Sequence, residues 1–225
     1  MTRQLQDQSR PAASGTTKSL VIFLHGYGAD GPDLLGLADP LSQHLPDTVF
    51  HAPNAPERSA ANPMGYQWFA IPWMDGSSED AANAGRLQAI EDLNAYIDDV
   101  MAAEGVTAAQ TALVGFSQGT MMALHVAPRR AEPFACVVGF SGRLLDPESL
   151  AAETVSRPPI LLIHGDADDV VPPQSLPEAG NALTEAGFDV FAHVMKGTGH
   201  GIAPDGLSVA LSMLHDKLGY GDKDK

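Results

Sequence analysis

The chain contains a single cysteine, Cys136, so it can form no intramolecular disulfide and no cluster of cysteine ligands around a metal ion. The residues around it, Ala135-Cys136-Val137-Val138, are apolar. This setting is typical of a buried small hydrophobe and not of a reactive thiol. The sequence therefore predicts neither a disulfide framework nor a cysteine nucleophile.

Basic residues are scarce, because only 13 Lys and Arg stand against 28 Asp and Glu, which gives a formal net charge of -15 at pH 7. A surface of this sign repels phosphate backbones and anionic lipid headgroups. Nucleic-acid binding and electrostatic docking to acidic membranes are therefore not expected.

Long apolar runs are also missing. None approaches the length of a transmembrane helix, and the opening residues MTRQLQDQSRPAASGTTKS lack the apolar core of a secretory signal. We expect a cytoplasmic protein without membrane insertion. Hydrophobic residues make up 44 % of the 225 positions, enough for one substantial core. We expect a single domain over 19–218, a flexible segment or edge hairpin over 1–18 and a polar tail over 219–225.

Short β-branched runs alternate with amphipathic segments along the chain. The runs predict strands at 19–24, 48–51, 111–116, 134–140, 160–163 and 189–195, and helices are predicted at 33–45, 81–104, 118–126, 173–186 and 207–218. Such alternation favours an α/β fold with a mostly parallel sheet flanked by helices. In this architecture the chemistry lies at the carboxyl ends of the strands.

The pentapeptide Gly115-Phe116-Ser117-Gln118-Gly119 fits G-x-S-x-G and lies between a predicted strand and a predicted helix. A serine on such a tight strand-to-helix turn exposes its Oγ, and the flanking glycines avoid clashes across the turn. We identify Ser117 as the candidate nucleophile. A second stretch, GFSGR at 139–143, begins in the same way, but Arg143 replaces the second glycine, so Ser141 is expected to be a structural turn residue.

A serine nucleophile needs a base, and the base needs a carboxylate to orient it. In doubly wound hydrolases these residues follow the serine in the order acid, then histidine. His200 lies in the flexible loop GTGHG at 197–201 and is the candidate base. The acid belongs to the loop after the strand at 160–163, where spacing favours Asp168 only weakly over Asp166 and Asp169.

The stretch GYGADG at 26–31 follows a predicted strand and fits the dinucleotide-binding pattern G-x-G-x-x-G. That pattern also requires an acidic residue about twenty positions further on, at the end of the second strand. His51 stands at that place. The dinucleotide interpretation is therefore disfavoured, and these glycines need another explanation.

Together, LHGYGADG (24–31), GFSQG (115–119), HGDADDVVP (164–172) and GTGHG (197–201) resemble the phospholipase/carboxylesterase family of α/β-hydrolases, which includes the acyl-protein thioesterases. The resemblance implies an α/β-hydrolase fold without a large lid domain, and it places the acid on Asp168. It also implies an oxyanion hole made by the backbone N–H groups of Tyr27 and Gln118. Family members commonly carry Leu where Tyr27 stands, a change that leaves the backbone donor in place.

The resemblance implies a serine carboxylesterase that cleaves small-molecule esters of short- to medium-chain acids through an acyl-enzyme, without metal or cofactor. The aromatic segment over 67–74 resembles the family loop that walls the acyl groove, although it could equally pack on its own side chains. The residues expected to contact substrate are Trp68, Phe69, Ile71, Trp73, Met74 and, across the groove, Leu144.

Other functions remain open at this point. An acyl-protein thioesterase or a lysophospholipase would use the same machinery, and a non-catalytic binding protein on a hydrolase scaffold is a more remote alternative. A dienelactone-hydrolase-like enzyme would require Cys at position 117, where this chain has Ser117. The resemblance also allows a homodimer. The natural substrate, its chain length and the oligomeric state cannot be read from the sequence.

Overall fold

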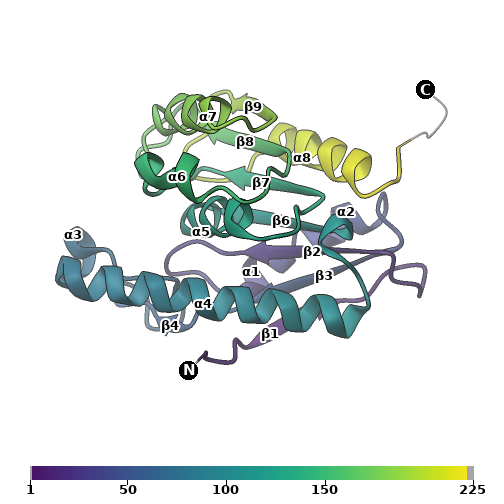
Figure 1. Cartoon of the computed structure of the whole chain (residues 1–225), viewed down its shortest axis with the longest axis horizontal. Helices are drawn as coiled ribbons and strands as arrows, with labels where there is room; N and C mark the ends of the chain where they lie inside the picture. The colour runs from purple at the N-terminus through teal and green to yellow at the C-terminus, as the bar shows by residue number, and fades with distance from the viewer. Residues whose placement is uncertain (1, 222–225) are drawn as a thin grey trace.

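A seven-stranded sheet organises the computed structural model, which describes residues 2–221 (Figure 1). Its strand order is β1-β3-β2-β6-β7-β8-β9, and every neighbouring pair is parallel except β1 with β3. The strands are β1 (Asp7–Arg10), β2 (Ser19–Leu24), β3 (Thr48–Pro53), β6 (Thr111–Phe116), β7 (Cys136–Phe140), β8 (Ile160–Gly165) and β9 (Val190–Met195). A separate two-stranded sheet joins β4 (Glu57–Arg58) to β5 (Tyr66–Gln67).

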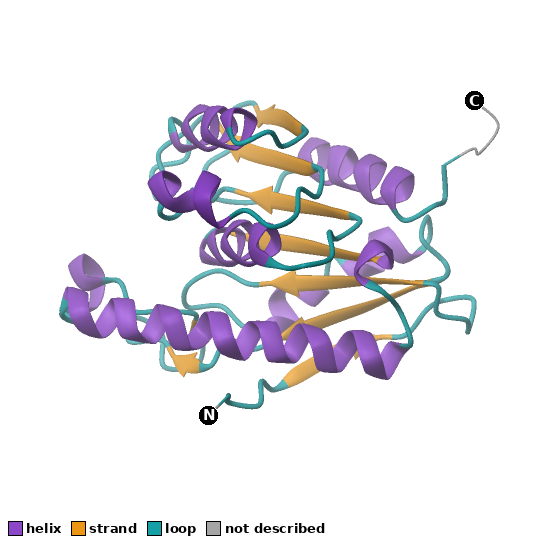
Figure 2. Cartoon of the chain, viewed as in Figure 1, coloured by secondary structure: helices purple, strands orange, loops and turns teal. Residues whose placement is uncertain are grey.

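Helices cover both faces of the main sheet (Figure 2). They are α1 (Gly31–Leu35), α2 (Ala38–Ser42), α3 (Pro72–Asp75), α4 (Glu79–Glu104), α5 (Gln118–Val126), α6 (Pro147–Glu153), α7 (Ser175–Glu185) and α8 (Pro204–Lys217), with 3-10 turns at Ala108–Gln110 and Ala127–Arg129. The predicted α/β architecture with a mostly parallel sheet is confirmed, and no large lid domain interrupts residues 2–221.

Strand β2 shows why the central strands read as continuous apolar runs. All six of its residues are buried. Leu20 and Ile22 face the core formed with α4, α5 and α7, whereas Val21 and Phe23 face the core formed with α1, α2 and α8. A parallel sheet covered on both faces has no solvent-facing side, so the alternation of polar and apolar residues disappears.

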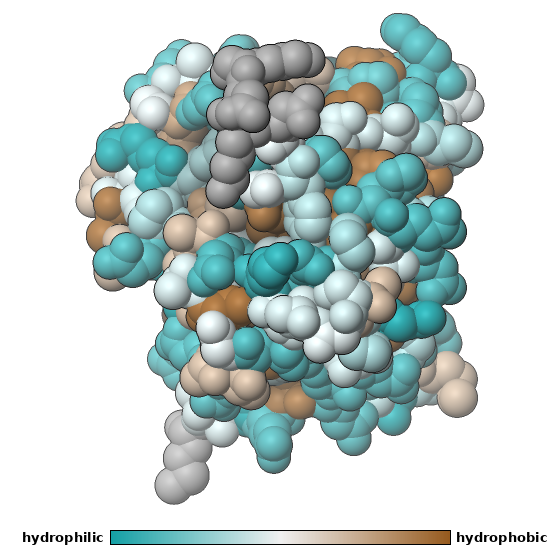
Figure 3. Space-filling view, turned by 90° about the vertical axis from the view of Figure 1, so that its right-hand side faces the viewer, coloured by the Kyte–Doolittle hydropathy of each residue, from teal (hydrophilic) through white to brown (hydrophobic). Residues whose placement is uncertain are grey.

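The strand directions decide where the site lies. The arrows of β2, β6, β7 and β8 point the same way, to the left in Figure 1, so the carboxyl ends of these strands, where we expect the site, lie on that side. The opposite face, at the amino ends of these strands, carries hydrophobic residues scattered among hydrophilic ones (Figure 3). Among residues 2–221 no helix is both long and apolar enough to cross a bilayer.

One predicted helix differs from the structure, and some observed elements have no counterpart among the predicted ones. The helix expected over 33–45 is two short helices, α1 and α2. Pro40 is the reason, because it lacks the N–H that would donate to the Gly36 carbonyl and continue one helix. The structure also contains α6, which the sequence patterns do not predict, and β1, an edge strand in the segment over 1–18 for which the sequence left a flexible segment or an edge hairpin open. Residues 222–225 of the predicted polar tail lie outside the described residues.

Candidate active site

The turn from β6 to α5 places Ser117 at the carboxyl edge of the sheet. Ser117 has φ 53° and ψ -115°, and its N–H donates to the Phe140 carbonyl at 2.8 Å. A positive φ in a non-glycine residue is strained and is typical of a serine displayed on a sharp elbow. Gly119 makes the turn possible, since a Cβ added there would lie 1.8 Å from the Leu24 carbonyl oxygen.

The loops after β8 and β9 bring Asp168 and His200 together. His200 Nδ1 lies 2.8 Å from Asp168 Oδ2, and the His200 ring centroid is 4.9 Å from the ring of Phe116, the residue before Ser117. Asp168 Oδ1 accepts hydrogen bonds of 2.9 Å from the N–H groups of Val170 and Val171. The structure therefore groups Ser117, His200 and Asp168 at one edge of the sheet.

The environment of Asp168 favours its carboxylate form. Burial of the carboxyl group raises its pKa, but the hydrogen bonds from His200 and from the Val171 and Val170 N–H groups outweigh burial, so the pKa of Asp168 lies below its ordinary value. An ionised Asp168 accepts a hydrogen bond from the Nδ1–H of His200, which leaves Nε2 of that ring without a proton and able to act as a base.

The structure also distinguishes the three candidate aspartates by their exposure and contacts. Asp166 is exposed, and its Oδ1 accepts from the Gly197 N–H at 2.6 Å, so it ties the β8 and β9 loops together. Asp169 is exposed as well. Asp168 is only 4 % exposed and is the one of the three in contact with an imidazole within residues 2–221.

The glycine-rich loop after β2 passes beside Ser117. A Cβ added at Gly26 would lie 3.3 Å from the Ser117 Cβ, and Gly28, with φ +80°, turns the chain so that its N–H donates to the Tyr66 carbonyl. Within residues 2–221 the N–H groups of Tyr27 and Gln118 donate to no protein acceptor. Two unpaired backbone donors beside a strained serine can bind an oxyanion.

The Gln118 side chain fastens the aromatic segment to the elbow. Its Oε1 accepts from the Trp68 N–H and its Nε2 donates to the Phe69 carbonyl, both at 2.8 Å. The Trp68 indole donates to the His25 carbonyl at 3.0 Å. Trp68 is fully buried and Phe69 is 9 % exposed, so these two residues support the segment from within.

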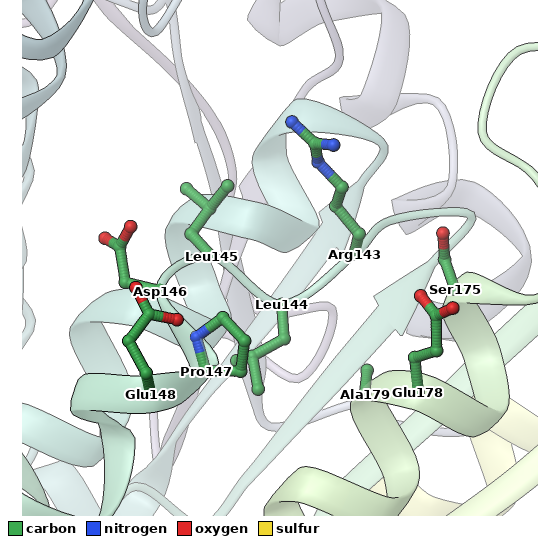
Figure 4. Close-up of a pocket in the computed structure, with 9 residues that line it drawn as sticks. All are labelled: Arg143, Leu144, Leu145, Asp146, Pro147, Glu148, Ser175, Glu178 and Ala179. Carbon is green, nitrogen blue, oxygen red and sulfur yellow. The ribbon is translucent and has the colours of Figure 1, made fainter.

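The remaining predicted substrate contacts lie nearer the surface. Ile71 is half-buried, whereas Trp73 is 74 % and Met74 51 % exposed on α3. The guanidinium carbon of Arg143 lies 5.9 Å from the Trp73 ring centroid. Leu144, on the loop between β7 and α6, lines a cavity of about 410 Å³ together with residues at the start of α7 (Figure 4).

Other residues of the sequence analysis lie apart from this cluster or support it. Ser141, the serine of the second GFS stretch, directly follows β7 and is buried with φ 46°. His51 contacts Asp7 and Glu104. Among residues 2–221 no group of three or more His, Cys, Asp and Glu side chains is arranged to hold a metal ion.

The patterns in the sequence missed one residue of this site. His164, the penultimate residue of β8, places Nε2 3.3 Å from Asp168 Oδ2. The signal was its position four residues before the acid, but spacing alone does not show that a strand residue and a loop residue face each other.

Comparisons with known proteins identify the family of this chain. Residues 11–217 match the Phospholipase/Carboxylesterase family. The chain is 33 % identical over 217 residues to "Esterase YpfH" of Escherichia coli (strain K12), covering 93 % of this chain and 85 % of that protein. It is 26 % identical to "Acyl-protein thioesterase 1" of Gibberella zeae, over 92 % of this chain and 94 % of the relative.

The crystal structure of esterase PE8 superposes with a TM-score of 0.91 at 45 % identity, covering 96 % of this chain and all of the other. The agreement in fold and sequence extends over nearly the whole chain. The chain therefore belongs to the phospholipase/carboxylesterase family of α/β-hydrolases and is a carboxylesterase of the serine hydrolase class.

Proposed function

We propose that this enzyme cleaves short- to medium-chain carboxylic esters by a double displacement in which Ser117 is the nucleophile, His200 the base and Asp168 the acid. The observation that carries the proposal is the 2.8 Å contact between His200 Nδ1 and Asp168 Oδ2 beside the strained Ser117. Tyr27 and Gln118 supply the oxyanion hole through their backbone N–H groups.

The proposed cycle begins when His200 Nε2 takes the Ser117 hydroxyl proton and Oγ attacks the acyl carbonyl. The negative oxygen of the tetrahedral intermediate accepts the Tyr27 and Gln118 N–H groups. His200 then protonates the leaving alcohol, and the acyl group remains on Ser117. A water molecule, deprotonated by His200, attacks this ester, and the acid leaves as Ser117 regains its proton.

The acyl chain is proposed to lie between the aromatic segment and the loop after β7. Ile71, Trp73 and Met74 would contact it on one side and Leu144 on the other, with Trp68 and Phe69 holding the segment in place. Arg143 supports this assignment, because it lines the cavity in Figure 4 and its guanidinium carbon lies 5.9 Å from the Trp73 ring centroid, so the two walls are neighbours.

The test is a series of initial rates on p-nitrophenyl esters from acetate to palmitate, with Ser117→Ala as the blank and Ser141→Ala as a matched control. We expect wild type and Ser141→Ala to exceed the blank by orders of magnitude and to peak at short or middle chains. Equal rates for wild type and Ser117→Ala on every ester would contradict the assigned nucleophile. A peak at palmitate would contradict the assigned chain length.

A second candidate is hydrolysis of acyl thioesters on proteins, favoured by the similarity to proteins named acyl-protein thioesterase. Paired rates on an oxyester and a thioester of one acyl group distinguish the two, because a thioesterase prefers the thioester by much more than their chemical reactivity explains. Lysophospholipids with anionic headgroups are disfavoured by the net charge of -15. We also propose that the enzyme is cytoplasmic, that it forms a homodimer and that its catalytic domain spans residues 19–218.

A further inference from the structure

His164 is a buried imidazole next to the proposed acid, and the mechanism above gives it no role. It belongs to β8 (Ile160–Gly165) and is only 2 % exposed. A polar ring buried to this degree needs hydrogen-bond partners, since an unpaired buried polar group is costly. The hydrogen-bond partners of His164 therefore indicate which part of the site the ring supports.

The contacts of the ring fix the position of its proton. His164 Nε2 lies 2.9 Å from the Val171 carbonyl oxygen. A carbonyl oxygen only accepts, so Nε2 must carry the hydrogen and donate it. The same Nε2 lies 3.3 Å from Asp168 Oδ2, but the hydrogen bond of this N–H goes to the Val171 carbonyl.

Val171 and Asp168 are themselves joined, which closes a ring of contacts. The Val171 N–H donates to Asp168 Oδ1 at 2.9 Å, while the Val171 carbonyl accepts from His164. Asp168 Oδ1 is thus held by the backbone of its own loop, Oδ2 is hydrogen-bonded to His200 Nδ1, and His164 Nε2 lies 3.3 Å from Oδ2. The carboxylate cannot rotate without breaking a contact at both oxygens.

We propose that His164 is a positioning residue for hydrolysis: its Nε2–H holds the Val171 carbonyl, and the N–H of Val171 holds Asp168 Oδ1, so that Oδ2 faces His200. This inference rests on the proposed function, in which Asp168 orients His200. His164 touches neither substrate nor the reacting atoms and acts only through Asp168. It also takes a share of the carboxylate's negative charge, which tempers how strongly Asp168 stabilises the His200 cation.

Two variants of His164 separate the donor from the space that the ring fills. His164→Leu removes the N–H, whereas His164→Gln keeps an N–H donor near the position of Nε2. His125→Leu is the matched control: it also removes a buried imidazole, but from the far end of α5, where His125 has no contact with Asp168. All are measured beside wild type and Ser117→Ala on one p-nitrophenyl ester.

We expect His164→Leu to lower kcat about tenfold and to change KM by less than about twofold, since the hydrogen bond that holds the Val171 peptide beside Asp168 is lost away from the substrate. The acidic limb of its kcat/KM profile moves to higher pH, because a carboxylate without the nearby Nε2–H favours the protonated form of His200. His164→Gln restores most of kcat and of the profile. His125→Leu leaves both unchanged.

The outcomes keep this inference apart from the proposed function. If wild type equals Ser117→Ala, the proposed function fails and His164 has no acid to position. If wild type is active and folded His164→Leu keeps its kcat and pH profile, the positioning role is overturned. If His164→Leu does not fold, ¹⁵N-histidine NMR of wild type decides. A neutral Nε2–H ring whose signal shifts in Asp168→Asn supports the role, and an Nδ1–H ring overturns it.

Discussion

The packing of α5 on β2 can be tested with a single methyl group. A Cβ added at Gly119 would lie 1.8 Å from the Leu24 carbonyl oxygen and 2.8 Å from that of His25. Both neighbours are backbone atoms of the central sheet and its first loop, so no side chain can rotate away. Helix and strand would have to separate by about 1.6 Å to reach ordinary contact at 3.4 Å.

The expected cost of Gly119→Ala follows from that overlap. Overpacking in a core typically costs about 1–3 kcal/mol, and a backbone obstacle puts this site at the upper end or beyond. We expect a loss of about 3 kcal/mol, which lowers the melting temperature of a chain this long by about 6–12 °C. Ser117 moves with α5, so kcat/KM should fall by about a hundredfold even where the variant is folded.

Gly180→Ala is the matched control, because Gly180 lies within α7 and a Cβ added there meets nothing within 4 Å. Alanine in a helix interior gains about 0.5–1 kcal/mol over glycine, so this variant should melt slightly above wild type and keep full activity. Calorimetric melting and ester hydrolysis are measured for both variants. A Gly119→Ala protein that melts and works like wild type would show that α5 does not rest directly on the end of β2.

Four further outcomes follow from the site and its surroundings. Asp168→Asn should lower kcat by about 10³–10⁴-fold in ester hydrolysis, whereas Asp166→Asn should cost stability in urea unfolding more than activity. Tyr27→Leu should keep kcat within about threefold, because the proposed donor is the backbone N–H. Leu144→Trp should move the peak of the p-nitrophenyl ester series to shorter chains by filling the cavity of Figure 4. Burial lowers the pKa of His51, but Asp7 and Glu104 outweigh burial and raise the pKa overall. The protonated His51 therefore contributes to the free energy of unfolding, fully below about pH 6.5 and less as pH rises through the raised pKa. The difference in unfolding free energy between wild type and His51→Gln, measured in urea, should narrow from about pH 6 to about pH 9.

The central strands and the main helices were predictable because burial imposes a pattern on them. Gln118–Val126 and Ser19–Leu24 have the predicted limits, since an elbow motif and a fully apolar run mark their ends. The limits of strand β1 could not be predicted, because its residues are all exposed and polar and it is held by backbone pairing with β3. Asp7 anchors it through His51 and the Tyr96 hydroxyl, contacts that join positions more than forty residues apart.

Helix α6 is a different case, since its signal was present in the sequence. Asp146-Pro147-Glu148 is a good helix start, with proline at the first helical position and an acidic residue in the first turn. Asp146 is also paired with Arg86 of α4. The sequence patterns do not predict this helix because it has only seven residues and buries a single leucine, Leu150, so it shows little apolar periodicity.

The acid of the site shows most clearly what sequence spacing leaves undetermined. Asp166, Asp168 and Asp169 lie within four residues, so any of them could reach a histidine from another loop. Their environments separate them: the backbone N–H groups of Val170 and Val171 turn back onto Asp168 and draw it inward, while Asp166 pairs outward with the Gly197 N–H. A carboxylate that is buried, held at both oxygens and kept ionised can orient an imidazole, whereas an exposed one is free to exchange partners with water. The turn that follows Asp168 and the nearby His164 therefore distinguish the proposed acid from its neighbours, and both features appear only when the loop is folded against β8.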